Sequence, residues 1–196
     1  FGPSEILIDQ IQRQGAVNWI KSQMSATGSV YTSGGDDRIH TNTSQTDFCQ
    51  LPAHVDDPYC WRDFFSHEPL TWDFYRNAVK QPDQLRQRVA LALQQVLVVS
   101  AVEVGGTYGL RRYHNMLLDS AFGNYRDLLR QVTQSPVMGD YLDHVNNDKV
   151  APNENYAREL LQLFSLGPCR LTITGELEGG KCRPTYDNTV VRNYAF

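Results

Sequence analysis

The chain has 196 residues, a length that fits one domain or one large piece of a domain. Hydrophobic residues make up 41% of it and charged residues 20%, so it can bury a core and does not belong to the disordered class. A net charge of −4 argues against a nucleic-acid partner, and no apolar run approaches the ~18–20 residues that a transmembrane helix needs.

The N-terminal segment predicts two short helices followed by a long loop. Ser4 is a suitable N-cap for a helix that continues to Gly15, and a second helix is expected from Ala16 to about Met24. Residues 25–60 are rich in Ser, Thr, Gly, Asp and Pro, a composition typical of a loop. Loops of this length are often functional.

The middle of the chain has helical spacing of its apolar residues. Residues 70–79 predict one helix, and the segment from Leu85 to Val99 predicts another that is apolar on nearly all sides. Such a helix is typically central and buried. Glycines at 105, 106 and 109 break the pattern, which then resumes near Tyr113 and again near Asn124.

The C-terminal part predicts three short helices and a small β-hairpin. Pro136 begins one helix, Asn153 caps a second that ends before Gly167, and a third is expected near Asp187. A Thr- and Gly-containing segment between Cys169 and Cys182 predicts the hairpin.

The four cysteines fall into two local pairs, Cys49 with Cys60 and Cys169 with Cys182. Their even number and the absence of a CxxC spacing favour two disulfides, with free buried thiols and a metal site as the alternatives. Disulfides indicate an oxidising compartment. The predicted fold class is therefore mainly α, a multi-helix array with one long disulfide-stapled loop and a small β-hairpin near the C-terminus.

Several long segments of the chain form distinctive motifs. The most distinctive runs from Asn153 to Gly167. The others run from Gln87 to Ser100, from Ala121 to Leu129 and from Ser135 to Leu142, with Phe1 to Ser4 and Pro184 to Tyr186 at the two ends. In this order they resemble the motifs of the DUF1800 family of exported bacterial proteins of unknown function.

The resemblance implies a secreted or periplasmic bacterial protein. Family members continue beyond the segment around Pro184, so residues 1–196 are expected to be a single helical domain or the N-terminal part of a larger DUF1800 domain whose C-terminal portion is absent. The expected partner is a DUF1501-type protein or that C-terminal portion. No family reaction or cofactor is carried over.

The candidate catalytic residues are Glu154, Arg158 and Glu159. Glu154 and Arg158 are four residues apart, so their side chains are neighbours on a helix. A carboxylate with a cation beside it can orient a substrate or tune an acid–base group. The alternative, which we favour, is a structural ion pair.

Two groups of residues are candidate metal ligands. Asp140 and His144, four apart and near Glu154 or Glu159, offer mixed nitrogen and oxygen ligands. Histidines and aspartates of the long loop could form a second, oxygen-rich ion site, namely His40, His54, His67, Asp36, Asp37, Asp56 and Asp57. Either set can equally consist of unligated polar residues.

Other residues have simpler interpretations. His114 is expected to be an interfacial or core histidine, and the Asn42 sequon matters only in a eukaryotic secretory setting. The aromatic residues Trp19, Trp61, Trp72, Phe74 and Tyr75 could stack on a sugar, although helical spacing favours core positions. The leading hypothesis is an interaction or structural module acting with partner chains. The alternatives are a hydrolase or metal-dependent enzyme and a carbohydrate-binding module.

Overall fold

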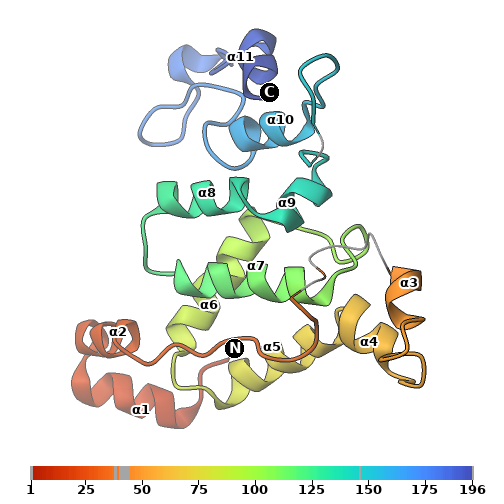
Figure 1. The fold of residues 1–196 in the computed structure, drawn as a ribbon. Coiled ribbons are helices and arrows are strands. Elements are labelled where there is room, and N and C mark those ends of the chain that lie inside the picture. Colours follow the sequence, from red (N-terminus) through yellow and green to blue (C-terminus); the bar gives the residue numbers. More distant parts are fainter. Residues whose placement is uncertain (1, 38, 40–44, 146, 196) are drawn as a thin grey trace. The chain divides into compact units, whose positions relative to one another are not determined.

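A computed structural model describes residues 2–37, 39, 45–145 and 147–195. Its contacts divide the chain into two compact units, Phe1–Val132 and Thr133–Phe196. The prediction of a mainly helical protein is confirmed (Figure 1). None of the helices in the described ranges is both long and apolar enough to cross a membrane.

Unit 1 begins with two helices joined at one glycine. Ser4 caps α1 (Glu5–Gln14) by accepting a hydrogen bond from the Leu7 amide at 3.2 Å. Gly15, at φ 79°, then turns the chain directly into α2 (Ala16–Met24), which packs on α6. Both helices lie where the sequence predicts them.

α4 (Cys60–Phe65), α5 (Glu68–Lys80) and α6 (Gln84–Val96) pack around α7 (Thr107–Asp119). α3 (Gln45–Cys49) packs on α4, and α8 (Tyr125–Thr133) follows α7 in the chain. α7 contacts α4, α5 and α6, and its buried side chains include Leu110, Tyr113, Leu117 and Leu118. The centre of this unit is therefore α7.

The expectation that residues 85–99 form the central buried helix is wrong. α6 ends at Val96, its buried residues are only Gln87 and Ala90, and Val96 and Val98 are 47% and 42% exposed. A helix with apolar residues on all sides is fully buried only if other helices cover every side. Other helices cover only part of the surface of α6, so its remaining apolar residues are exposed.

The long loop contains a disulfide bond, and the segment 29–35 precedes it. Cys49 and Cys60 form the predicted disulfide, with their Cα atoms 5.9 Å apart. It joins α3 to α4 beside a small apolar cluster of Ile39, Phe48, Cys60 and Phe65. The covalent bond and this cluster therefore stabilise the same region.

Residues 29–35 have no regular secondary structure, bend at Ser33 and Gly34, and run across the helices (Figure 1). Among the described residues no strand lies beside them. Side chains take the place of that strand. The Asn115 amide accepts from the Tyr31 N–H at 2.8 Å and donates to the Tyr31 carbonyl at 3.0 Å, as a neighbouring peptide would. Asp83, fully buried, accepts from the amide and hydroxyl of Ser29 at 2.9 and 2.7 Å.

Asp73 of α5 makes the densest of these contacts. Its carboxylate is fully buried and accepts from the amides of Thr32 and Ser33 at 2.5 and 2.7 Å and from the Ser33 hydroxyl at 2.7 Å. Arg76 supplies the counter-charge at 2.7 Å. The buried carboxylate is thus paired and hydrogen-bonded, as burial of a charge requires.

Unit 2 contains α9 (Pro136–Tyr141), α10 (Asn155–Gln162), a short 3₁₀ turn (Glu178–Gly180) and α11 (Asn188–Tyr194). Asp187 caps α11 by accepting from the Val190 amide at 3.0 Å. Its core joins α10 to α11 through Ala157, Leu161, Val191 and Ala195. The Cys169–Cys182 disulfide is formed as predicted, with a Cα separation of 5.0 Å.

The predicted β-hairpin is wrong. Between Cys169 and Pro184 the structure has two isolated antiparallel bridges and no strand among the described residues. Ile173 is fully exposed, so neither face of the segment is buried. Gly175, Gly179 and Gly180 adopt positive φ and interrupt the pairing. A two-stranded ladder without a covered face is only marginally stable.

Replacing Asp73 with alanine should lower the free energy of unfolding by about 2–4 kcal/mol, because the amides of Thr32 and Ser33 and the Ser33 hydroxyl all lose their acceptor. Urea unfolding of the oxidised protein measures this. The matched control is Asp9→Ala, which breaks the exposed ion pair with Arg13 and should cost less than about 1 kcal/mol. Equal losses in the two variants would contradict this account of residues 29–35.

Candidate functional site

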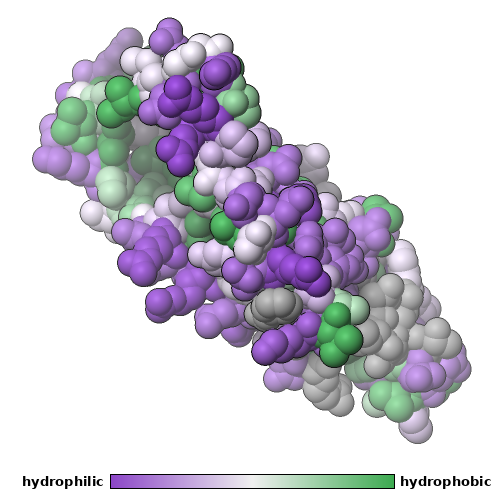
Figure 2. Space-filling model, turned by 90° about the horizontal axis from the view of Figure 1, so that it is seen from above, coloured by the Kyte–Doolittle hydropathy of each residue, from purple (hydrophilic) through white to green (hydrophobic). Residues whose placement is uncertain are grey.

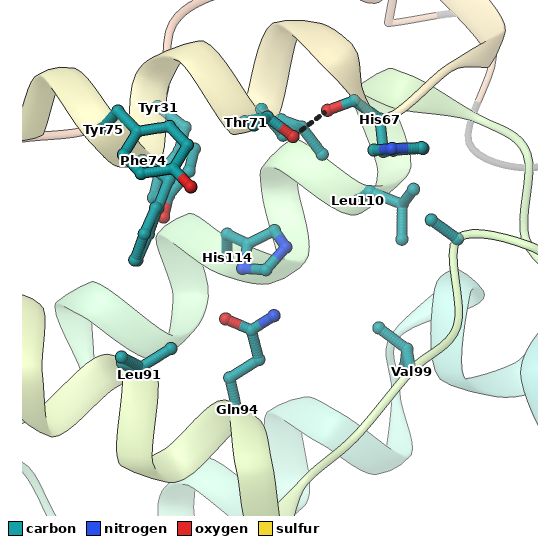
Figure 3. Close-up of a pocket in the computed structure, with 12 residues that line it drawn as sticks. Tyr31, His67, Thr71, Phe74, Tyr75, Leu91, Gln94, Val99, Leu110 and His114 are labelled. Atoms are coloured by element: carbon teal, nitrogen blue, oxygen red, sulfur yellow. Dashed lines mark hydrogen bonds between the residues drawn. The ribbon is translucent and has the colours of Figure 1, made fainter.

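A cavity of about 340 Å³ lies within unit 1, between α5, α6, α7 and the loop after α6 (Figure 3). Leu70, Leu91, Leu110 and Val99 supply apolar walls. Thr71 and Tyr75 of α5 and His67, which immediately precedes this helix, are exposed and form the rim. A mainly apolar cavity with a few polar groups is the usual form of a small-ligand site.

His114 of α7 is the polar group inside this cavity. Its imidazole stacks on the Tyr31 ring at 5.2 Å with an interplanar angle of 21°. The hydrogen bonds of the described residues include none to its ring nitrogens, so the imidazole faces the cavity unpaired (Figure 3). Burial lowers the pKa of His114 to about 4. At neutral pH the ring therefore offers one N–H donor and one nitrogen acceptor.

Gln94 of α6 faces His114 from the opposite wall (Figure 3). Its amide also has no hydrogen-bonding partner among the described residues. An amide and a neutral imidazole both donate and accept, so together they can bind a polar edge of a ligand. Burial, with the charge of Asp73 as a smaller cause, raises the pKa of Tyr31 to about 12, so its phenol is neutral as well.

The predicted catalytic residues lie in unit 2, on α10 or at its start. Arg158 Nη2 is 2.9 Å from Glu154 Oε2, and both side chains are partly exposed. Glu159 has one enclosed carboxylate oxygen that accepts no hydrogen bond from the described residues. The structure thus pairs Glu154 with Arg158, and that geometry fits a local ion pair.

Asp140 and His144, the candidate metal ligands, also lie in unit 2. The His144 ring packs on Tyr156 at 4.7 Å. Burial raises the pKa of Asp140, and the neighbouring Asp143 raises it further. Within the described ranges, no three His, Cys, Asp or Glu side chains are grouped so that they could hold a metal ion.

The candidate ion site of the long loop is not assembled among the residues described. His54 stacks on Phe48 at 4.3 Å, and His67 is at the rim of the cavity. His40 and the Asn42 sequon lie outside the described residues.

The core interpretation of the aromatic residues is wrong for three of them. Trp61, Trp72 and Tyr75 are 55%, 50% and 63% exposed. α5 turns Leu70, Asp73 and Asn77 inward, so Trp72 lies on the solvent side of the same helix. The helical spacing indicated that aromatic residues lie on one face of a helix. It did not indicate which face of that helix the neighbouring helices cover.

Sequence reasoning missed His114 and Gln94 as a pair. His114 was expected to be a core or interfacial histidine, and Gln94 carried no signal. They lie 20 residues apart on different helices, so no local motif joins them. Only the packing of α6 on α7 brings both to one cavity.

The fold and cavity define a mainly helical, disulfide-bonded protein with a largely apolar cavity in unit 1. The model of one family, described as "Protein of unknown function (DUF1800)", matches residues 1–195, so the chain belongs to this family and the resemblance is confirmed. No curated protein matches the chain, and no solved structure does.

The low pKa of His114 predicts a pH-dependent stability. The unfolded chain binds a proton near pH 6.5 and the folded chain only near pH 4, so acidification between these values favours unfolding. The loss should reach about 2–3 kcal/mol over this window. Urea unfolding at pH 7.5 and 4.5 measures it.

In the variants His114→Phe and His114→Gln, the loss of unfolding free energy that comes from protonation of His114 should vanish. The pH dependence that comes from the carboxylates should persist. An unchanged difference between the two pH values in both variants would show that His114 is accessible to protons in the folded protein.

Proposed function

We propose that this DUF1800 chain is an extracytoplasmic, non-catalytic binding module whose unit 1 takes a small ligand into the His114 cavity. The ligand has an apolar body and one polar edge. The observation that carries the proposal is the pair of unpartnered polar groups, His114 and Gln94, that face each other inside an otherwise apolar cavity.

The side chains of His114 and Gln94 are partly buried, and a polar group that loses contact with water gains stability from a hydrogen-bonding partner. A ligand that both donates and accepts would satisfy His114 and Gln94 at once, while Leu70, Leu91 and Leu110 cover its apolar part. Because both polar groups are neutral at physiological pH, they favour a neutral heteroaromatic or phenolic molecule over a charged one.

The same observation favours binding over acid–base catalysis. A general base works best when its pKa is near the operating pH, and the pKa of His114 is about 4. The alternative enzyme, a hydrolase or metal-dependent enzyme using Glu154, Arg158 and Glu159, has less support because Glu154 and Arg158 neutralise each other.

The two disulfides support a secreted or periplasmic location. Such bonds persist in oxidising compartments and are rare in the cytosol. All four cysteines are used in them, and none is free.

The binding proposal can be tested with phenol and indole as probes. Both should raise the thermal midpoint of the oxidised protein and shift amide NMR signals of residues that line the cavity. Ala101→Trp, at the rim, should abolish both effects. Val102→Trp, one residue further and 89% exposed, does not line the cavity and should leave them intact.

Gln94→Leu and His114→Phe should each weaken binding of the probes, because the polar edge then lacks a partner. The proposal is overturned if neither probe binds, or if Ala101→Trp and Val102→Trp bind the probes equally.

A second candidate function is binding of a partner chain through unit 2. Aliphatic side chains are highly exposed there, led by Val150 at 93% and Ile173 at 105%, with Leu163, Leu166 and Leu171 at 57–58%. On the face seen in Figure 2, hydrophobic residues lie in several groups within a mainly hydrophilic surface. If these side chains come together in one patch, that patch would suit an apolar partner surface.

Copurification of a DUF1501-type protein with the tagged chain tests this candidate. Ile173→Asp should reduce the yield of the partner at least tenfold. Ile6→Asp, a change at a 73% exposed residue of unit 1, should not. Absence of any copurified partner, or equal loss in both variants, contradicts it.

A further inference from the structure

We propose that unit 1 has a second binding site, an open groove beside Trp72 that binds a neutral polysaccharide. This goes beyond the proposed function, because the groove lies apart from the His114 cavity and shares none of its lining residues. It is about 530 Å³ in volume and lies between residues 32–35, α4, α5 and Arg111 of α7.

The groove has an exposed aromatic wall. Trp72 lines it and is 50% exposed, and Tyr59, 54% exposed, lies nearby across Arg62. Large aromatic side chains are more often buried. Two exposed aromatic rings near each other therefore suggest that a ligand covers them. The apolar C–H face of a pyranose ring is the natural partner of such a flat, exposed ring.

A rigid hydrogen-bonding pair lies beside the aromatic wall. Arg62 donates to Asp63 through Nε at 2.7 Å and through Nη2 at 3.1 Å. Its guanidinium also lies 4.1 Å from the centre of the Tyr59 ring and 5.2 Å from that of Trp72. These contacts fix both planar groups before a ligand arrives.

Part of this pair is available to a ligand. The hydrogen bonds of the described residues do not use Arg62 Nη1, and each Asp63 carboxylate oxygen accepts one bond from Arg62. Donors and acceptors that lie side by side can bind adjacent hydroxyl groups of a sugar, since each hydroxyl both donates and accepts.

Glycine backbone forms part of the lining of the groove. Gly34 and Gly35 have φ of 68° and 78°, and a Cβ on Gly34 would come within 2.7 Å of the Asp63 carbonyl oxygen. A Cβ on Gly35 would lie 2.5 Å from the Tyr108 amide nitrogen. Glycine at these two positions therefore lets the segment pack closely against α4 and α7, and it adds no side chain to the groove. An open groove suits a chain of sugars, because it can cover one side of several units.

The charges of the lining favour a neutral ligand. Arg62 and Arg111 are balanced by Asp57 and Asp63. Asp63 holds the Arg62 guanidinium, and Arg111 donates to the backbone carbonyls of Thr32 and Gly34. A polyanion would gain little here, so binding should depend weakly on salt.

Affinity electrophoresis of the oxidised protein in native gels tests the proposal. The probes are soluble hydroxyethylcellulose, xylan, galactomannan and laminarin, with polygalacturonate as the acidic comparison. At least one neutral polysaccharide should retard the protein, and 0.5 M salt should change the dissociation constant less than twofold. Trp72→Ala should weaken retardation at least tenfold.

The matched control is Trp61→Ala. Trp61 is 55% exposed and comes from α4, yet it does not line the groove, so its loss should leave retardation unchanged. Unchanged urea unfolding of Trp72→Ala shows that the variant is folded, and Asp63→Asn provides a second, polar change that should also weaken binding. Ala101→Trp should retain polysaccharide binding, which separates this site from the cavity.

Three outcomes overturn the proposal. One is that no neutral polysaccharide retards the protein. The second is equal loss in Trp61→Ala and Trp72→Ala, which indicates non-specific stacking. The third is stronger, salt-sensitive retardation by polygalacturonate, which makes the groove a site for anions.

Discussion

Unit 1 depends on the way its segment 29–35 is held between helices. Among the described residues no strand lies beside residues 29–35, so their backbone groups must find hydrogen bonds elsewhere. Asp73 of α5, Asp83 at the start of α6 and Asn115 of α7 supply the missing donors and acceptors. These three side chains therefore fix α5, α6 and α7 relative to one another as well as to the segment.

Both candidate sites of this unit border the same segment. Tyr31 packs against His114 in the cavity, whereas residues 32–35 line the groove. One short segment therefore contributes to two sites, because the chain passes from one to the other between Tyr31 and Thr32. The Asp73 carboxylate, which holds Thr32 and Ser33, also faces Tyr31 closely enough to raise the pKa of its phenol.

The cavity and the groove both have little net charge, but for different reasons. In the cavity, burial lowers the pKa of His114 and leaves an uncharged ring without a partner. In the groove, charged groups remain but are paired, Arg62 with Asp63. Mainly apolar walls suit a small molecule that replaces water, and an open, charge-balanced surface suits a polymer that stays largely hydrated.

The sequence by itself determined the features that depend on near neighbours. Caps such as Ser4 and Asp187, most of the helices and both disulfide pairs follow from short-range spacing and backbone preferences. The hairpin prediction failed because a ladder also needs a covered face. Only the tertiary structure decided which polar residues meet, since His114 and Gln94, like Asp73 and Ser33, come together through packing between elements that no local pattern records.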